Sequence, residues 1–230
     1  MHLRNSFIVI AVLLIALLLI GASVAARQTH TSPGDMSPNF DGRYTVLGTN
    51  PDGAQYTGSL DVITQGSVFE FRWNVGGQYE GIGVKNGKIV AVAFANGGDG
   101  SGCGVVNYMI MNDGTLDGIW GNWGTNASGT EKAKHIGGRG IEGEYAATGT
   151  NPNGTSYQVN ISVKPAGHGY KFVWSNKTEG FGIRRGGNLA VGFGGDRCGF
   201  VAYQVMPDGS LDGVWGGSSQ LTGTEKATRQ

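Results

Sequence analysis

The sequence predicts an all-β protein built from two tandem antiparallel modules, each an eight-stranded up-and-down barrel. Three observations lead to this fold class: a long segment occurs twice, apolar and polar residues alternate with a period of two, and turn-forming dipeptides separate the alternating runs. The chain has 230 residues, of which 43 are glycine. The glycines follow no Gly-X-Y period, so they indicate many turns and not a collagen helix.

The internal repeat fixes the domain boundaries. Gly42–Tyr56 (GRYTVLGTNPDGAQY) returns as Gly143–Tyr157 (GEYAATGTNPNGTSY), and Asp113–Gly121 (DGTLDGIWG) returns as Asp208–Gly216 (DGSLDGVWG). The matched segments keep the same order, which indicates a tandem duplication. We therefore predict one β-module over residues 41–134, a short linker at 135–141 and a second β-module over 142–230.

The strands are indicated by alternation that both copies share. Residues 69–75 (FEFRWNV) place aromatic and aliphatic side chains on one face, and residues 170–174 (YKFVW) repeat the pattern. Turn signals such as Asn-Pro-Asp-Gly at 50–53 and Asn-Gly at 86–87 suit tight hairpins. A meander of short hairpins can close into a barrel and so remove its exposed edges. A two-sheet β-sandwich is the alternative, and the likeness to the lipocalin and avidin layout is one of fold alone.

The N-terminus predicts export. Residues 7–20 form an uninterrupted apolar run, and the small-residue segment GASVAA at 21–26 follows it. This layout is typical of a cleaved secretory signal over residues 1–26, although 7–24 is also just long enough to anchor the chain in a membrane. The polar, proline-bearing residues 27–40 are expected to be a flexible tether. Either interpretation places the modules outside the cytoplasm, as a secreted, periplasmic or cell-surface protein.

Several motifs recur in both modules and suggest a family. They are G-x-Y-x-x-x-G-x-N-P-[DN]-G, an aromatic strand that ends in Trp, E-G-x-G, D-G-x-L-D-G-x-W-G and G-T-E. In the first module the residues that form them are Tyr44, Asn50, Pro51, Gly53, Tyr56, Trp73, Gly81, Gly83, Trp120, Gly129 and Glu131. This pattern resembles small secreted bacterial domains labelled fibronectin-binding proteins. The resemblance implies an exported binding module with an extracellular-matrix type of partner.

Composition excludes several functions. Lysine plus arginine and aspartate plus glutamate both number 17, so the formal net charge is zero and nucleic acid is not an expected partner. The four histidines form no spaced metal-binding pair, and no motif for a catalytic nucleophile or a bound phosphate occurs. We expect no enzyme activity, no metal and no cofactor. A membrane contact is expected only through an uncleaved N-terminal segment.

The duplicated polar and aromatic side chains are the candidates for a ligand site. Glu80 and Glu179 alternate in phase with apolar neighbours, which predicts a carboxylate near each barrel mouth if that face points inward. A carboxylate bonded to the backbone of a turn is the competing interpretation. The aromatic candidates for the same site, which could equally be core residues, are Trp73, Tyr108, Trp120, Trp174, Tyr203 and Trp215. Trp123 has no counterpart in the second copy and is predicted to be an exposed contact residue.

The two cysteines occupy matching places, one in each module. Cys103 and Cys198 share a strand face with small or apolar residues, and the adjoining strands place Ala91, Ala93 and Ala190 on the same face. An outer face without polar residues predicts that the two modules pack together. That packing could join the cysteines in a disulfide, and two separately buried thiols are the alternative.

The sequence therefore leaves two functions to compare. The first is an exported adhesive or scaffold protein that binds a protein partner through its surface loops, and it predicts filled barrel interiors. The second is a carrier of a small apolar or aromatic ligand, and it predicts a cavity lined by the tryptophans. A hydrolase is a third and weaker candidate, because general-acid catalysis would need a second positioned carboxylate.

Overall fold

The computed structural model describes residues 39–217 and 221–230, which belong to one compact unit. The predicted leader at 1–26 and nearly all of the predicted tether at 27–40 lie outside the described residues. The last tether residue, Phe40, is described, and it is buried in a barrel core. In the described part of the chain, no helix is long and apolar enough to cross a membrane.

Sixteen strands make up the regular structure of the described residues, eight from each copy. Those of the first copy are β1 (Gly42–Thr49), β2 (Gln55–Gln65), β3 (Val68–Asn74), β4 (Gln78–Asn86), β5 (Ile89–Asn96), β6 (Gly104–Ile110), β7 (Leu116–Asn122) and β8 (Gly129–Arg139). Those of the second copy are β9 (Glu142–Thr150), β10 (Ser156–Ala166), β11 (Gly169–Trp174), β12 (Glu179–Arg185), β13 (Asn188–Phe193), β14 (Gly199–Val205), β15 (Leu211–Gly216) and β16 (Thr222–Arg229).

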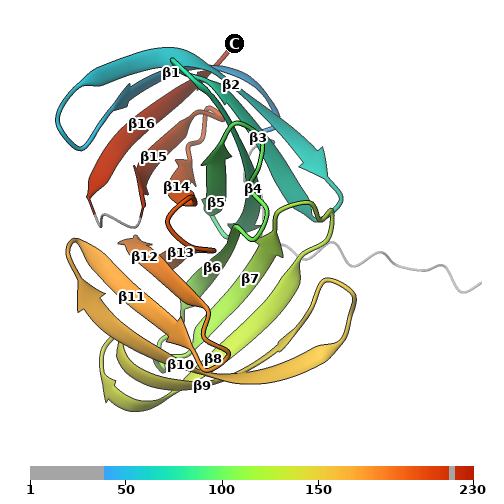
Figure 1. Ribbon diagram of the computed structural model, residues 1–230, viewed down its shortest axis with the longest axis vertical. Helices are drawn as coiled ribbons and strands as arrows, with labels where there is room; N and C mark the ends of the chain where they lie inside the picture. The colour runs from blue at the N-terminus through green and yellow to red at the C-terminus, as the bar shows by residue number, and fades with distance from the viewer. Residues whose placement is uncertain (1–38, 218–220) are drawn as a thin grey trace, which may run out of the picture. The chain divides into compact units, whose positions relative to one another are not determined.

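The strands form two closed antiparallel barrels of eight strands each, which confirms the predicted fold class and rules out the sandwich. Barrel A has the order β1-β16-β15-β14-β5-β4-β3-β2, and barrel B has the order β10-β11-β12-β13-β6-β7-β8-β9. Each barrel therefore takes five strands from one copy and three from the other. Figure 1 shows this exchange in its colours, because the red and orange strands β14–β16 complete the barrel of the blue and green strands β1–β5.

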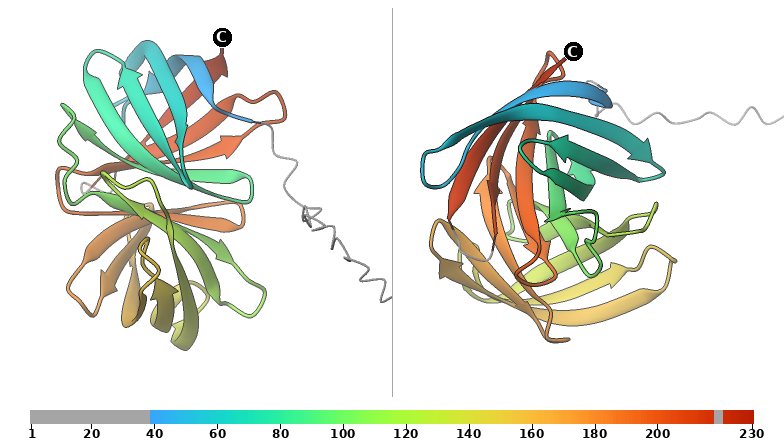
Figure 2. Two further views of the ribbon diagram at one scale, coloured as in Figure 1. Left: turned by 90° about the vertical axis from the view of Figure 1, so that its right-hand side faces the viewer. Right: turned by 45° about the horizontal axis from the view of Figure 1, so that its top comes forward.

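The exchange takes place at two equivalent connections. Consecutive strands pair as hairpins except at residues 97–103, between β5 and β6, and at residues 194–198, between β13 and β14. At these points the chain passes into the other barrel, so β5 pairs with β14 and β13 pairs with β6. Both views of Figure 2 show strands from the two halves of the chain in each barrel.

The boundary between the copies does not separate the barrels. The predicted linker at 135–141 is mostly strand, because β8 runs to Arg139 and a tight turn leads directly into β9. His135 pairs with Tyr145, and a bulge lies between His135 and Gly137. The hairpin β8–β9 belongs wholly to barrel B, where it closes the cylinder in the same way as the β16–β1 pair closes barrel A.

The two barrels share a buried apolar face, as the small residues around the cysteines predicted. Side chains of β4, β5 and β14 in barrel A meet side chains of β6, β12 and β13 in barrel B, and Ala91, Ala93 and Ala190 are fully or almost fully buried there. The members of this cluster are Val68, Ile82, Val84, Ala91, Ala93, Ala95, Cys103, Val105, Phe181, Ile183, Ala190, Cys198, Phe200 and Ala202. Small residues allow the strands of two barrels to approach closely, which explains the non-polar outer face.

Buried asparagines join the barrels at one side of this face. The Asn107 Nδ2 group donates to the carbonyl oxygen of Ile89 at 2.8 Å, and the Asn188 Nδ2 group donates to Asn107 Oδ1 at 3.0 Å. Asn188 also donates to the carbonyl oxygen of Asn86. Because buried polar groups must be paired, this network fixes how β6 and β13 sit against β4 and β5. The repeat does not predict this network, since Asn107 corresponds to Ala202 in the second copy.

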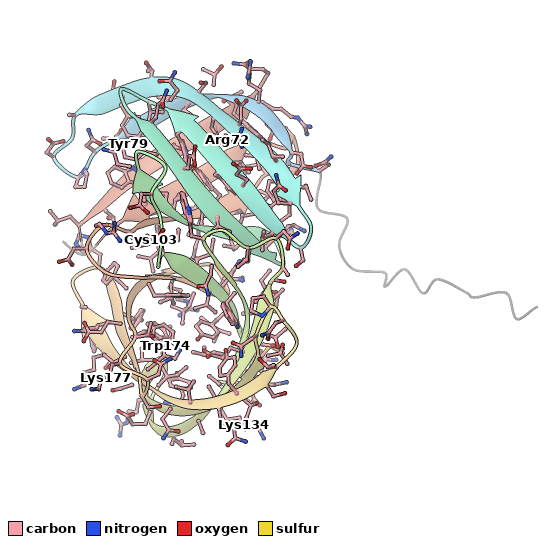
Figure 3. The ribbon with its side chains drawn as sticks, turned by 45° about the vertical axis from the view of Figure 1, so that its right-hand side comes forward. Arg72, Tyr79, Cys103, Lys134, Trp174 and Lys177 are labelled. Carbon is pink, nitrogen blue, oxygen red and sulfur yellow. A yellow bond between two sulfur atoms is a disulfide. The ribbon has the colours of Figure 1, made fainter. Side chains whose placement is uncertain are left out.

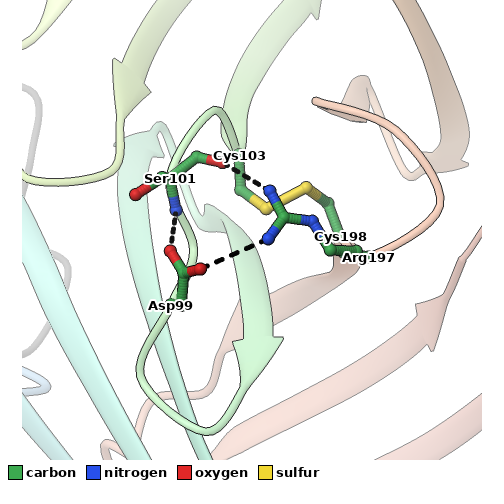
Figure 4. A network of polar contacts seen from close by, with 5 residues as sticks. All are labelled: Asp99, Ser101, Cys103, Arg197 and Cys198. Atoms are coloured by element: carbon green, nitrogen blue, oxygen red, sulfur yellow. Dashed lines mark hydrogen bonds and ion pairs between the residues drawn. A yellow bond between two sulfur atoms is a disulfide. The ribbon is translucent and has the colours of Figure 1, made fainter.

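A disulfide joins the two exchange points. Cys103 ends the first crossing loop, Cys198 ends the second, and their sulfur atoms are bonded. This settles the choice left open between a disulfide and two free thiols. Arg197 in the second loop forms an ion pair with Asp99 at 3.3 Å and donates to the carbonyl oxygen of Ser101 at 3.3 Å (Figure 4). The two loops that carry the exchange are thus tied covalently and by charge.

Cross-linking tests the exchange. Thr45 on β1 and Thr228 on β16 are exposed cross-strand partners, so a Thr45→Cys, Thr228→Cys pair in a Cys103→Ser, Cys198→Ser background should cross-link within one molecule. The matched control is Thr45→Cys with Lys134→Cys, because β8 would replace β16 beside β1 if each copy closed on itself. Lys134 lies on barrel B (Figure 3). Efficient cross-linking of the control pair, measured by peptide mapping, would contradict the exchanged topology.

Removal of the native disulfide should lower stability without changing the fold. The bond closes a loop of 95 residues, and a bridge of this length typically stabilises a protein by about 2–5 kcal/mol. The Cys103→Ser, Cys198→Ser variant should lose free energy of unfolding in this range by denaturant titration and keep its near-ultraviolet circular dichroism. An unchanged unfolding midpoint would show that the bond contributes nothing to the folded pair.

Candidate functional site

Each barrel is closed at one end and hollow at the other. In barrel A, Phe40 covers the closed end, where the Tyr44 hydroxyl donates to the Phe40 carbonyl oxygen at 2.5 Å. In barrel B, Tyr145 makes the equivalent bond to the carbonyl oxygen of Ile141 at 2.8 Å. Four residues beyond Tyr44 on β1, Gly48 pairs with both β2 and β16 at the opposite end. The open end therefore lies beside Gly48, and beside its counterpart Gly149 in barrel B.

A buried carboxylate lies beneath the open end of barrel A. Glu225 on β16 is 6% exposed. Its Oε1 accepts hydrogen bonds from the Trp73 Nε1 group at 3.0 Å and from the Tyr203 hydroxyl, and its Oε2 accepts one from the Tyr56 hydroxyl at 2.8 Å. Three donors offset much of the cost of burying the carboxylate.

Barrel B repeats the same cluster. Glu131 on β8 is 4% exposed, and its Oε1 accepts from the Tyr108 hydroxyl and from the Trp174 Nε1 group at 3.3 Å. Its Oε2 accepts from the Tyr157 hydroxyl at 2.9 Å. Figure 3 shows Trp174 inside the ring of strands. Each cluster consists of one glutamate, one tryptophan and two tyrosines from equivalent strands.

The exchange makes each cluster a product of both copies. In barrel A the carboxylate and Tyr203 come from the second copy, whereas Tyr56 and Trp73 come from the first. In barrel B the origins are reversed. A copy that kept its own strands in its own barrel would build the same cluster, so the exchange preserves the site while dividing its residues between the copies.

Motif glycines make room for the rings of these clusters. A Cβ atom on Gly48 would lie 2.0 Å from Cζ of Tyr56, and one on Gly213 would lie 2.6 Å from Cδ1 of Tyr203. Such distances do not occur between real side chains, so both positions need glycine. Gly149 and Gly118 give the same clearance to Tyr157 and Tyr108 in barrel B. The recurrence of these glycines in G-x-N-P-[DN]-G and D-G-x-W-G therefore has a physical reason at the site.

Burial and the neighbouring charge change the protonation behaviour of the cluster. Removal from water raises the pKa of Glu225 above its ordinary value, although the hydrogen bonds from Tyr203, Trp73 and Tyr56 act in the opposite direction. The pKa of Tyr203 is raised well above its usual range, mainly because the phenol is removed from water and also because the negative charge of Glu225 lies beside it. The pKa of Tyr108 is raised for the corresponding reasons beside Glu131. The phenols therefore remain protonated donors at physiological pH.

A pocket opens above each cluster. Pocket A, in barrel A, has a volume of about 240 Å³, and pocket B, in barrel B, has a volume of about 550 Å³. Both are lined by equivalent tryptophan, tyrosine, phenylalanine and valine side chains around one carboxylate. In pocket A these residues are Tyr56, Trp73, Phe94, Val201, Tyr203, Trp215 and Glu225. In pocket B they are Tyr157, Trp174, Phe193, Val106, Trp120 and Glu131. Tyr108, the counterpart of Tyr203, lies below pocket B and donates a hydrogen bond to Glu131.

One indole donor at each pocket is poorly paired. The Nε1 groups of Trp215 and Trp120 are buried beside the hydroxyl groups of Tyr56 and Tyr157, respectively, but form no hydrogen bond of ordinary geometry among the described residues. Both tryptophans line their pockets. A buried donor without an acceptor carries a cost of about 1–3 kcal/mol. The same poorly paired donor occurs at the same position in both barrels, against Gly223 in barrel A and Gly129 in barrel B.

The aromatic residues predicted for the site are brought together, whereas the predicted carboxylates are not. Trp73, Trp215 and Tyr203 meet in barrel A, and Trp174, Trp120 and Tyr108 meet in barrel B. Glu80 shares a face with Ile82, as expected, but that face points out of the barrel, towards the face shared with barrel B. Glu179 also lies outside, in an ion pair with Lys171 at 2.9 Å.

Glu131 and Glu225 fill the place that was expected for Glu80 and Glu179. The sequence signal for them was the repeated G-T-E, in which the glutamate shares its strand face with a buried alanine two residues later. An inward carboxylate could have been assigned from that alternation. The hydroxyls of Tyr56 and Tyr157 were likewise available as duplicated aromatics at strand starts.

Trp123 is half-buried and not an exposed contact residue. Its ring lies over Gly100 in the first crossing loop, where a Cβ atom would come within 2.1 Å of the ring. Its backbone N–H group donates to the carbonyl oxygen of Cys103 at 2.9 Å. Trp123 therefore covers the exchange loop beside the disulfide.

Across residues 39–217 and 221–230, no group of three or more histidine, cysteine, aspartate or glutamate side chains could hold a metal ion. Comparisons of the chain with protein-family models, with curated proteins and with solved structures found no match. The resemblance to domains labelled fibronectin-binding proteins thus stays a prediction. The site must be interpreted from its own geometry.

Alkaline pH should destabilise the protein through its buried phenols. A tyrosine of an unfolded chain ionises near pH 10, whereas burial raises the pKa of Tyr44 and Tyr145 to about 12 and also raises the pKa of Tyr108 and Tyr203 well above the ordinary value. Their contribution to stability is complete below about pH 10 and is lost as the pH rises above it, by up to about 1.4 kcal/mol per pH unit for each tyrosine.

Denaturant titrations between pH 9 and pH 11, together with phenolate absorbance, measure this effect. The absorbance should show that these tyrosines ionise only as the protein unfolds. A Tyr203→Phe variant should show a shallower decline in stability with pH. A free energy of unfolding that stays constant above pH 10 would contradict the assignment.

Proposed function

We propose that the protein is a binder of small aromatic ligands, which it holds in the open ends of its two barrels. The observation that supports this function best is the pair of equivalent pockets, each lined by tryptophan, tyrosine, phenylalanine and valine side chains around one carboxylate. Aromatic walls with a few fixed polar groups are typical of small-molecule sites. The small-ligand carrier predicted a cavity lined by tryptophans, whereas the adhesive protein predicted filled barrels.

The pocket chemistry defines the kind of ligand. Phe94 lies between Trp73 and Trp215, with ring centroids at 5.7 Å and 6.5 Å. These rings favour a flat, apolar body. The indole donor favours a hydrogen-bond acceptor on that body, such as a carbonyl oxygen. Glu225 is the only carboxylate in the lining of pocket A, and no lysine or arginine lines it, so an anionic ligand is disfavoured.

The single carboxylate also supports binding over hydrolysis. Glu225 and Glu131 each stand alone in their pockets, and each already accepts three hydrogen bonds from the chain. A pair of positioned acid and base groups is absent from both linings as described. We therefore assign the carboxylate a positioning role, in which it orders the tyrosine and tryptophan side chains that form the pocket floor.

Binding by an exported adhesive protein to an extracellular-matrix partner stays a prediction of the sequence. The large apolar side chains that are exposed in the described structure, such as Leu47, Ile63 and Ile136, are few, and the structure offers no feature that identifies a protein partner. Export itself rests on residues outside the described part.

Calorimetry with coumarin and naphthalene tests the proposal. Both are flat and neutral, but only coumarin has a carbonyl acceptor for the indole N–H group. Coumarin should bind more tightly than naphthalene by about fivefold or more, which corresponds to one hydrogen bond of about 1 kcal/mol. In a Trp215→Phe, Trp120→Phe variant the preference should disappear while a ring still lines each pocket.

A Trp123→Phe variant is the matched control, because Trp123 lies over the crossing loop and outside both pockets. It should retain the preference for coumarin. Two results would contradict the proposed function: no heat of binding for either compound, or the same preference for coumarin after both pocket tryptophans have been replaced.

A further inference from the structure

The two pockets have the same floor and different rims. Their floors match residue for residue around Glu225 and Glu131. At the rim, Tyr79 precedes Glu80 in the first copy and lines pocket A, whereas the corresponding residue before Glu179 is Thr178, which lines pocket B. Two residues beyond the floor tryptophan, Val75 lines pocket A and its counterpart Asn176 lines pocket B.

Tyr79 extends the aromatic wall of pocket A. Its ring meets Phe94 edge-on, with centroids 6.1 Å apart and planes at 85°. In pocket B, the counterpart Phe193 contacts Trp174 at 6.0 Å, and threonine replaces the ring that Tyr79 supplies. The missing ring agrees with the larger volume of pocket B, which is about 550 Å³, whereas that of pocket A is about 240 Å³. Pocket A is smaller than the roughly 300 Å³ at which pockets for drug-sized ligands begin, and pocket B is well above it.

The rim of pocket B is rich in amide and hydroxyl groups. Asn151, Gln158, Ser175, Asn176 and Thr178 all line it, and every one can both donate and accept hydrogen bonds. Lysine and arginine are missing from the described lining, and Glu131 supplies the one carboxylate. Such a rim matches a neutral ligand that carries several hydroxyl groups.

The backbone at this rim is held in an uncommon conformation. Lys177 has a φ of 72°, where its counterpart Gly76 has a φ of 84°. A residue with a side chain is disfavoured in this region, and strain of this kind is frequent at binding sites. The turn is held by the Asn176 Oδ1 atom, which accepts from the Thr178 N–H group at 3.0 Å. The polar turn at pocket B is therefore maintained against a local conformational cost.

We infer that the two pockets select different ligands: pocket A takes a compact apolar aromatic molecule, and pocket B takes a larger, neutral aryl glycoside whose sugar hydroxyls meet the rim. This inference rests on the proposed function, because both ligands share the aromatic body that the common floor accepts. The sugar is placed at the rim, where Asn176 and Thr178 replace Val75 and Tyr79.

Calorimetry with coumarin and a coumarin β-glucoside tests the inference, because the two probes share a ring and a carbonyl acceptor. Pocket A is measured in a Val106→Trp variant, in which the added indole blocks pocket B, and pocket B is measured in the matched Val201→Trp variant. Pocket A should favour coumarin over the glucoside by about tenfold or more, since the sugar meets Tyr79 and Val75. Pocket B should favour the glucoside.

Exchange of the rims supplies the matched control. Thr178→Tyr with Asn176→Val should remove the glucoside preference of pocket B by about tenfold, and Tyr79→Thr with Val75→Asn should let pocket A accept the glucoside. Because the rim residues are partly or fully exposed, these variants should fold, which near-ultraviolet circular dichroism checks.

The possible failures are distinct. If both pockets bind both probes with equal preference, or if the rim exchange changes nothing, the divergence of the pockets is overturned while the proposed function stands. If neither probe binds to either pocket, the proposed function and the inference fail together.

Discussion

The pairing of β5 with β14 and of β13 with β6 is the constraint on which the rest of the structure depends. It sends the last three strands of each copy into the other barrel, and it brings the two crossing loops close enough for the Cys103–Cys198 bond. It also supplies each pocket with a carboxylate from one copy and with two of its three donors from the other. The shared apolar face, the disulfide and the division of each site between the two copies all accompany this exchange.

The exchange has a simple energetic background. Because β5 and β13 are copies of one strand, β6 meets nearly the same side chains whether it pairs with its own neighbour or with the equivalent strand. The hydrogen bonds and side-chain contacts between these paired strands therefore differ little between the exchanged and the unexchanged topology. In the observed topology, the contacts between the barrels include the buried asparagine network around Asn107 and the small residues Ala91, Ala93 and Ala190. The disulfide between the two crossing loops stabilises the exchanged topology further.

The near-identity of the two possible strand pairings explains what could and could not be predicted from the sequence. Alternation and turn residues were enough for the strands, for closed eight-stranded barrels and for the buried face around the cysteines, because those features depend on local pattern. The exchange could not be predicted, since duplicated strands give the same pattern in either pairing. At the site, the tryptophans and tyrosines were found by their duplication. Glu80 and Glu179 were assigned to the wrong side of the sheet, because alternation tells which residues share a face but not which face is inside.

The division of each pocket between the copies has a consequence for how the protein can change. In an ordinary tandem duplication, one copy can drift or be lost while the other keeps its site intact. Here a substitution in the first half of the chain affects pocket A if it falls before residue 97 and pocket B if it falls after residue 103. Each half therefore contributes strands to both barrels, and deletion of either would leave both barrels of this structure incomplete.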